Sequence, residues 1–338
     1  MNTPNWKNRT LFHGDNLDIL RGMNSESVDL IATDPPFNKG RDFHATPDSL
    51  TAGSKFQDRW SWDHDVHQAW VDQIIDDHPK LWGAIEAARF THSDSMGAFL
   101  CFLAVRVLAM HRILKPTGSL WLHCDDTASH YIKLMLDAIF GVEHFRNEVV
   151  WQRTYPKNTQ ATKFHRVTDR LLHYAKNAKM SIFNPMRLDA SNLKPRKGGK
   201  IRIDAKTGRE YMWADITAPK GGTNSRFFEF MGVVPKRPWM WGKDELQKAW
   251  DDGLLEKNAT GDRIYRKKFM DSRQGPFVND LWTDIERLHQ VSVERVGYPT
   301  QKPVALYERI IKASAPEGGI VLDPFAGCAT TCVAAERL

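Results

Sequence analysis

The sequence predicts an α/β fold built on a doubly wound, mostly parallel sheet. Two segments far apart in the chain support this prediction, because each reads as a short buried strand that ends at a sharp turn. The mostly apolar run Val28–Ala32 leads to Asp34-Pro35-Pro36-Phe37, and Gly319–Leu322 leads to a Gly-containing turn and the helical run Cys332–Leu338. Strand, turn and helix in this order are typical of α/β proteins, which bind ligands at the carboxyl ends of their strands.

Local signals predict the elements of the first third. A strand is expected to end at 13–15, and a short helix over 16–23 separates it from the strand at Val28. Residues 38–60 are rich in Asn, Gly, Thr, Asp and Ser, which predicts a long loop. A loop of that length beside a functional turn is usually functional or disordered, and we interpret it as a lid or a DNA-contacting loop, with disorder as the alternative.

Further elements follow from capping and breaking residues. A mostly apolar helix over 95–114 precedes a strand, and Asp126 and Gly141 are suited to cap the two ends of the next helix. Another strand is expected from Glu148. A helix over 303–314 begins at a proline and is stopped by the Pro and Gly residues that follow it.

The turn after the first buried strand carries a chemically suggestive set of groups. Two prolines cannot continue a strand, so the backbone turns there. The Asp34 carboxylate and the Pro35 carbonyl could both accept hydrogen bonds from one NH2 group, while the Phe37 ring could stack on a flat base. The tetrapeptide alone is equally compatible with an ordinary Pro-rich turn.

Together the two segments resemble the DNA amino-methyltransferases that use S-adenosylmethionine. In that family Asp-Pro-Pro-Phe/Tyr is the catalytic motif and Asp-Pro-Phe-x-Gly-Ser-Gly-Thr-Thr is the cofactor loop, which look like 34–37 and Asp323–Thr331 here. The catalytic motif comes first, as in the circularly permuted β class with its Rossmann-like methyltransferase fold. The resemblance covers roughly 1–151 and 281–338, and includes Thr10–Leu20, Gly118–Asp126 and Gly297–Pro303.

The resemblance implies methylation of adenine N6 on a base flipped out of DNA. Its implied catalytic residues are Asp34, Pro35, Pro36 and Phe37. Its implied S-adenosylmethionine-binding residues are Asp323, Phe325 and Gly327, with Asp15, Thr300 and Lys302 as further candidates. It also implies double-stranded DNA as the partner, with a homodimer and a cognate restriction endonuclease as further candidate partners; no metal is expected.

Two departures from the family pattern stand out. Cys328-Ala329 replaces the usual Ser-Gly, and Ala takes a positive φ less readily than Gly. The sequence also stops at Leu338, before the family strand whose acidic residue binds the cofactor ribose. We therefore expect the natural gene to continue, and a protein ending at Leu338 to bind S-adenosylmethionine poorly.

Charge is unevenly distributed over the chain, whose net charge is +6. Residues 151–280 carry 27 Lys and Arg against 14 Asp and Glu, whereas the remainder has a net charge of −7. This predicts a DNA-binding, target-recognition insert at 152–280 between catalytic-domain parts at 1–151 and 281–338. Candidate phosphate-binding residues are Lys194, Arg196, Lys197 and Lys200. A solvated Lys-rich surface, with Trp213, Trp239 and Trp241 forming a small core, is the plainer alternative.

Several rival functions compete with adenine methylation. Cytosine-N4 methylation uses the same amine chemistry, but that branch more often has Ser at the position of Asp34. A 5-methylcytosine enzyme would present Pro-Cys, which does not occur here. A catalytically impaired DNA-binding protein on the same fold is the alternative of another class, and a protein or RNA methyltransferase would not need so basic an insert. With no run of 18 apolar residues, we expect no membrane partner and a bacterial, cytoplasmic, nucleoid-associated protein.

Overall fold

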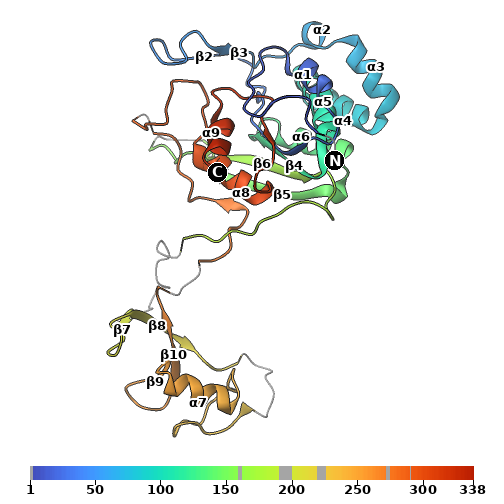
Figure 1. Cartoon of the computed structure of the whole chain (residues 1–338). Coiled ribbons are helices and arrows are strands. Elements are labelled where there is room, and N and C mark those ends of the chain that lie inside the picture. The colour runs from blue at the N-terminus through green and yellow to red at the C-terminus, as the bar shows by residue number, and fades with distance from the viewer. Residues whose placement is uncertain (1–2, 159–161, 190–199, 219–225, 272–274, 290) are drawn as a thin grey trace. The chain divides into compact units, whose positions relative to one another are not determined.

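The chain divides into two compact units (Figure 1). A computed structural model describes residues 3–158, 162–189, 200–218, 226–271, 275–289 and 291–338. The larger unit comprises Met1–Pro185 and Asn279–Leu338, and the smaller unit comprises Met186–Val278. The insert expected from 152 thus begins later, because the strand Thr168–Ala175 lies within the sheet of the larger unit.

The larger unit contains a six-stranded mixed sheet, with the order β11-β5-β6-β4-β1-β12 among the described residues. All neighbours pair in parallel except β6, which pairs antiparallel with β4 and β5. The strands are β1 (Val28–Thr33), β4 (Leu114–Cys124), β5 (Phe145–Gln152), β6 (Thr168–Ala175), β11 (Leu281–Trp282) and β12 (Val321–Leu322).

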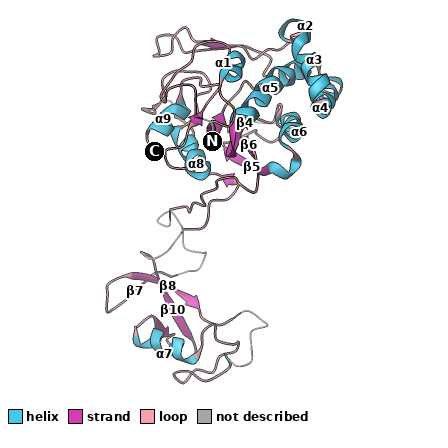
Figure 2. Ribbon diagram, turned by 45° about the vertical axis from the view of Figure 1, so that its right-hand side comes forward, coloured by secondary structure: helices cyan, strands magenta, loops and turns pink. Residues whose placement is uncertain are grey.

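Helices cover both faces of this sheet (Figures 1 and 2). One face packs against α5 and α6, with α1, α3 and α4 beside them, and the other against α8, which packs on α9. The helices are α1 (Asn16–Gly22), α2 (Trp62–Asp65), α3 (Gln68–Asp77), α4 (Pro79–Thr91), α5 (Asp94–Ile113), α6 (Ser129–Phe140), α8 (Val304–Ser314) and α9 (Thr330–Glu336), with a 3-10 turn at Val142–His144. The predicted doubly wound, mostly parallel sheet is confirmed.

Side chains of β4 point alternately to the two faces of the sheet. Leu120 and Leu122 point into the main hydrophobic core beneath α5 and α6. Trp121 and His123 point to the opposite face, where Trp121 Nε1 donates a hydrogen bond to Ser314 Oγ of α8 at 2.9 Å. Functional side chains of this strand are therefore expected on the α8 side of the sheet.

Helix α5 is long and apolar enough to cross a membrane by length and composition. Most of it is buried within the larger unit, and it supplies much of the main core. These are the properties of a core helix in a globular domain.

Three sequence predictions need correction. Residues 10–15 form no strand, and the chain there leads directly into α1. The segment 38–60 is not a simple loop, since β2 (Phe43–His44) and β3 (Lys55–Phe56) pair as a short antiparallel hairpin within it. The N-cap of α6 is Ala128, because the Asp126 carboxylate pairs instead with Arg166 at 2.8 Å.

The smaller unit is an antiparallel sheet of order β7-β8-β10-β9 with α7 packed on one face. Its elements are β7 (Arg202–Ile203), β8 (Glu210–Asp215), α7 (Lys243–Asp251), β9 (Leu255–Lys257) and β10 (Ile264–Phe269). Trp239 is 1% exposed in its core, and Trp241 packs against that core. Trp213 lies outside it and stacks on Tyr265 with the ring centroids 4.6 Å apart.

Candidate active site

The carboxyl ends of four strands meet at one edge of the main sheet, where antiparallel β6 begins. Asp34, Asp125 and Asp323 follow β1, β4 and β12 directly or within one residue, Arg153 follows β5, and Asp169 lies at the start of β6. Charged groups from five strands therefore converge at the edge where α/β folds bind ligands.

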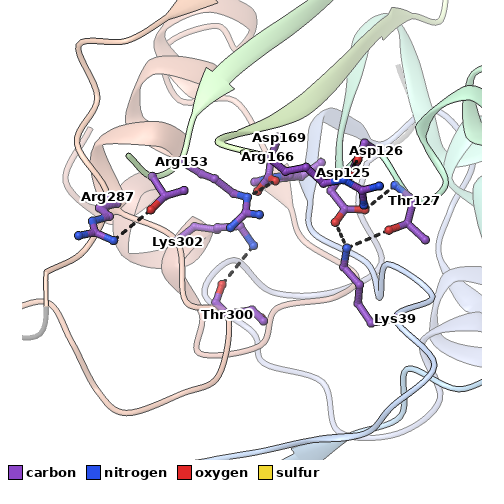
Figure 3. Close-up of polar contacts among 12 residues, drawn as sticks. Lys39, Asp125, Asp126, Thr127, Arg153, Arg166, Asp169, Arg287, Thr300 and Lys302 are labelled. Atoms are coloured by element: carbon purple, nitrogen blue, oxygen red, sulfur yellow. Dashed lines mark hydrogen bonds and ion pairs between the residues drawn. The ribbon is translucent and has the colours of Figure 1, made fainter. Parts of the chain in front are cut away.

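Asp34 is held by Lys302, which is distant in sequence. Lys302 Nζ donates a hydrogen bond to Asp34 Oδ2 at 2.6 Å and another to the Thr300 carbonyl at 3.1 Å (Figure 3 shows the latter). The ammonium group also lies 5.2 Å from the centroid of the Phe37 ring. Lys302, which the resemblance assigns to the cofactor, thus contacts the turn that holds the proposed catalytic residues.

The other oxygen of Asp34 faces a buried histidine. Asp34 Oδ1 lies 3.8 Å from His123 Nδ1, and both atoms are buried without a hydrogen-bond partner. The imidazole ring contacts the rings of Phe37 and Trp151, at centroid distances of 5.6 and 5.8 Å. Its far side, Nε2, lies 3.1 Å from Asp169 Oδ2.

Asp169 carries a negative charge deep in the site. Burial alone would raise its pKa, but the His123 hydrogen bond and the charges of Arg153 and Lys302 outweigh burial and lower it. The closest of these charges is Arg153, whose Nε lies 2.6 Å from Asp169 Oδ1 (Figure 3). The group therefore remains an anion and a hydrogen-bond acceptor at neutral pH.

Asp323 organises the loop after β12. Its Oδ1 accepts hydrogen bonds from Thr33 Oγ1 at 2.7 Å and from the Phe325 backbone N–H at 3.1 Å, and its Oδ2 accepts one from Thr331 Oγ1 at 2.7 Å. Burial raises the pKa of Asp323 to about 6, although the threonine hydroxyls oppose this. The Thr33 contact joins the two predicted motifs across 290 residues of chain.

Two positions of this loop have a positive φ. Gly327 has φ +54°, and a Cβ there would lie 3.2 Å from the Tyr298 ring, so the backbone approaches that ring closely. Ala329 has φ +61° at the N-cap of α9. Ala329 therefore adopts the left-handed conformation that the family's Gly would take, which raises the free energy of the fold by about 1 kcal/mol or more.

The segment after Phe37 is fixed by Asp58 and Asp125. Asp58, 1% exposed, accepts hydrogen bonds from the backbone N–H groups of Asn38 and Lys39 at 2.6 and 3.0 Å. The Lys39 ammonium pairs with Asp125 and donates to Thr127 Oγ1 at 2.8 Å (Figure 3). These contacts fix the chain directly after the 34–37 turn.

A cavity of about 650 Å³ lies over this edge. That volume is within the range of small-molecule sites. It brings together nine of the ten proposed catalytic and cofactor residues: Asp34, Pro35, Pro36, Phe37, Thr300, Lys302, Asp323, Phe325 and Gly327. Basic side chains also line it, namely Lys39, Arg41, Arg153 and Arg287.

Asp15, the tenth candidate, does not line this cavity. Its Oδ1 caps α1 by accepting the Leu17 N–H at 2.8 Å, and both of its oxygens accept from Arg106 Nη2 at 2.8 and 3.1 Å. Arg106 is buried, so it needs this anion as a partner. These contacts give Asp15 a structural role, and the cofactor contact implied by the resemblance stays a prediction.

Most of the proposed phosphate-binding cluster lies outside the described residues. Lys194, Arg196 and Lys197 lie outside the described residues, and Lys200 is exposed. Sequence reasoning missed His123, Asp169 and Arg153 altogether. Because side chains alternate along a strand, the β4 sequence could have placed His123 on the same face of the sheet as Trp121. No local feature of the sequence links His123 to Asp169.

The family model described as DNA methylase (N6_N4_Mtase) matches residues 28–338, so the chain belongs to this DNA methylase family. It is 27% identical over 346 residues to the type III restriction-modification enzyme StyLTI Mod subunit of Salmonella typhimurium, covering 96% of this chain and 49% of that protein. It is 27% identical over 243 residues to the type II methyltransferase M.EcaI of Enterobacter cloacae, covering 71% and 53%. It is also 25% identical over 325 residues to the DNA adenine methyltransferase YhdJ of Escherichia coli, covering 96% and 73%. The chain spans about half the length of the first two relatives.

Proposed function

We propose that this protein transfers a methyl group from S-adenosylmethionine to the N6 amine of adenine in double-stranded DNA. The observation that carries the proposal is that the Asp34 turn and the Asp323 loop line one cavity. Membership in the DNA methylase family and the names of the relatives, one of them a DNA adenine methyltransferase, support the same function.

The cavity suits S-adenosylmethionine in size and in chemistry. Phe325, Gly327 and Tyr298 would surround the cofactor with aromatic and backbone surface, and Thr300 would lie beside it. Aromatic faces and nearby carboxylates favour a cationic ligand. Three acceptor positions of Asp323 are filled by protein donors, which leaves one lone pair of Oδ2 for a ligand. When bound, the cofactor supplies an electrophilic methyl group on a sulfonium.

The catalytic turn would make the adenine amine a better nucleophile. The amine lone pair is delocalised into the ring, and accepting both N–H bonds at Asp34 and at the Pro35 carbonyl would localise it on nitrogen. Lys302 occupies only one lone pair of Asp34 Oδ2, so that oxygen can still accept the amine. Phe37 would stack on the flipped base. The contribution of the chain is positioning and preorganised hydrogen bonding.

The smaller unit, Met186–Val278, and the basic segment that contains it are proposed to recognise the DNA. Support comes from the excess of Lys and Arg between 151 and 280 and from the location of the proposed catalytic groups in the other unit. Cationic groups of this kind bind phosphate irrespective of sequence, while side chains at base edges give specificity.

The biological setting follows from the same proposal. We infer action on bacterial DNA in the cytoplasm, associated with the nucleoid, within a restriction-modification system. A homodimer and a cognate restriction endonuclease are the partners proposed. Light scattering of the purified protein and co-purification with the product of a neighbouring nuclease gene would test the two partners separately.

The test of function is identification of the methylated base. DNA incubated with the protein and methyl-labelled S-adenosylmethionine is digested to nucleosides, which are separated and identified by mass spectrometry. Label in N6-methyladenine is the expected result. Label in N4-methylcytosine would assign the protein to the rival amine chemistry, and DNA binding without label would favour the catalytically impaired alternative.

A further inference from the structure

Two buried polar atoms face each other at the centre of the site. Asp34 Oδ1 and His123 Nδ1 are 3.8 Å apart, and neither has a hydrogen-bond partner. Buried polar atoms are nearly always hydrogen-bonded, and exceptions in native proteins are often functional. Here the two exceptions are aimed at one another.

The contact on the other side of the imidazole decides which atom carries a hydrogen. A carboxylate can only accept, so the 3.1 Å contact with Asp169 places the hydrogen of a neutral His123 on Nε2. Nδ1 then presents a lone pair toward the lone pairs of Asp34 Oδ1. One proton placed between these two atoms would satisfy both of them.

The surroundings suit a transient positive charge on His123. The charged groups nearest the imidazole are the carboxylates of Asp34 and Asp169, while Lys302 and Arg153 each pair with the opposite side of one of these carboxylates. His123 itself is 1% exposed. An imidazolium at His123 would therefore lie between two carboxylates, which Lys302 and Arg153 hold in place by ion pairs.

We propose that His123, oriented by Asp169, receives through Asp34 the proton that the target amine loses. The inference rests on the proposed function and deepens it. His123 acts through Asp34, and Asp169 acts through His123, so both are positioning residues that do not touch the base.

The proton moves from the amine to His123 in two transfers. After methyl transfer the amine nitrogen is cationic; one of its N–H bonds breaks, the electron pair stays on nitrogen, and the proton goes to the Asp34 carboxylate. The proton arrives on Oδ2, so the carboxyl group must turn about its Cβ–Cγ bond before the O–H faces His123; that O–H bond then breaks and an N–H bond forms at Nδ1. Asp34 is again a carboxylate, and the imidazolium releases the proton to water before the next turnover.

The test is a single-turnover methylation assay with the whole protein between about pH 5.5 and 8.5, the range in which histidines titrate. Wild-type rates should fall on the acid side, because the transfer requires a neutral imidazole as the acceptor. His123→Gln should lower the rate by about 10²-fold, a typical contribution of a proton-transfer group, and leave only the part of the acid fall that comes from Asp323, whose pKa burial raises to about 6. Affinities for DNA and cofactor should change less than about twofold.

His173→Gln is the matched control. His173 is also buried in the main sheet and stacks on Trp121, but it has no contact with Asp34. It should retain the wild-type rate and pH profile even if its melting temperature falls as much as that of His123→Gln. Equal losses of rate in the two variants, or a His123→Gln rate within twofold of wild type at every pH, would overturn the inference.

Asp169→Asn provides a second route if His123→Gln fails to fold. Removing the carboxylate disfavours the imidazolium, so the acid fall should move to lower pH and the rate should drop about tenfold or more. An unmoved acid fall would overturn the inference. A wild-type protein that methylates no base would instead overturn the proposed function, and the inference with it.

Discussion

The two units differ in how completely their buried polar groups are hydrogen-bonded. Among the described residues, every buried side-chain atom without a hydrogen-bond partner belongs to the larger unit, and those on Asp34, His123 and Asp169 lie at the strand edge described above. In the smaller unit, Lys267 pairs with Asp204 at 2.7 Å, and Tyr211 donates to Glu256 at 2.7 Å.

This difference indicates a division of labour. Unsatisfied buried groups are costly, and those of Asp34 and His123 lie where the chemistry is proposed, whereas the paired groups of the small sheet are consistent with a scaffold for surface contacts. The proposed catalysis and the proposed DNA recognition are therefore expected to be separable by mutation.

The largest effect is expected at the catalytic turn. Asp34→Ala should reduce methyl transfer at least about 10³-fold, because it removes the acceptor for the amine. Folding, cofactor binding and DNA binding should be largely retained, as judged by circular dichroism and by titration. Asp126→Asn is a suitable control, since that carboxylate pairs with Arg166 and does not line the cavity. Turnover of Asp34→Ala close to wild type would show that the assignment is wrong.

Removing the largest side chain in the core of the smaller unit tests whether the two units are independent. Trp239→Ala should destabilise that unit by about 3–5 kcal/mol, through the cavity left and the loss of the 2.9 Å bond to the Phe228 carbonyl. DNA affinity should fall while calorimetric binding of S-adenosylmethionine is unchanged. Trp213→Ala, outside that core, should cost much less stability. Loss of cofactor binding in Trp239→Ala would contradict the separation.

The basic segment should contribute the electrostatic part of DNA binding. Replacing Lys194, Arg196, Lys197 and Lys200 with Gln should weaken binding to all sequences alike. The slope of log K against log salt should flatten by about 0.9 for each phosphate that the variant no longer neutralises. Replacing four exposed lysines of the larger unit, Lys7, Lys80, Lys179 and Lys312, gives a control of equal charge change. An unchanged slope in the first variant would show that this segment does not contact phosphate.

Acid should destabilise the larger unit first. Burial lowers the pKa of His173 to about 3 and that of His111 to about 4, so both are neutral in the fold but charged at low pH when unfolded. Since the unfolded chain then binds more protons, stability should fall as pH drops below about 6.5, by up to about 1.4 kcal/mol per pH unit for each histidine. His173→Gln should make denaturant-measured stability less dependent on pH between about 4 and 6. Equal pH dependence in variant and wild type would refute this.

The smallest effect concerns the loop after β12. Ala329→Gly should stabilise the larger unit by about 1 kcal/mol, because glycine adopts φ +61° without the penalty of a Cβ. Ala326→Gly in the same loop has no such positive φ and should be destabilising. Chemical denaturation curves of the two variants would check the opposite signs, and equal signs would contradict the strain assigned to Ala329.

The sequence by itself determined the two motifs and the architecture around them. Prolines, glycines and apolar runs act over a few residues, so the turn at Asp34, the loop at Asp323, and the helices α5 and α8 could be predicted locally. The same local reasoning wrongly predicts a strand at 10–15. It also assigns Asp126 as a helix cap, because the local sequence does not show whether an acidic residue near a helix start caps the helix or forms an ion pair.

Only the tertiary structure decided which charges meet. The ion pairs of Asp34 with Lys302 and of Asp15 with Arg106 join residues 268 and 91 positions apart, and β6 joins the main sheet although its sequence falls within the predicted insert. A buried charge requires an opposite charge, but sequence does not say which one, because that depends on strand order and on the face to which each side chain points. For this reason His123 and Asp169 became visible as parts of the site only once β4 and β6 were seen side by side.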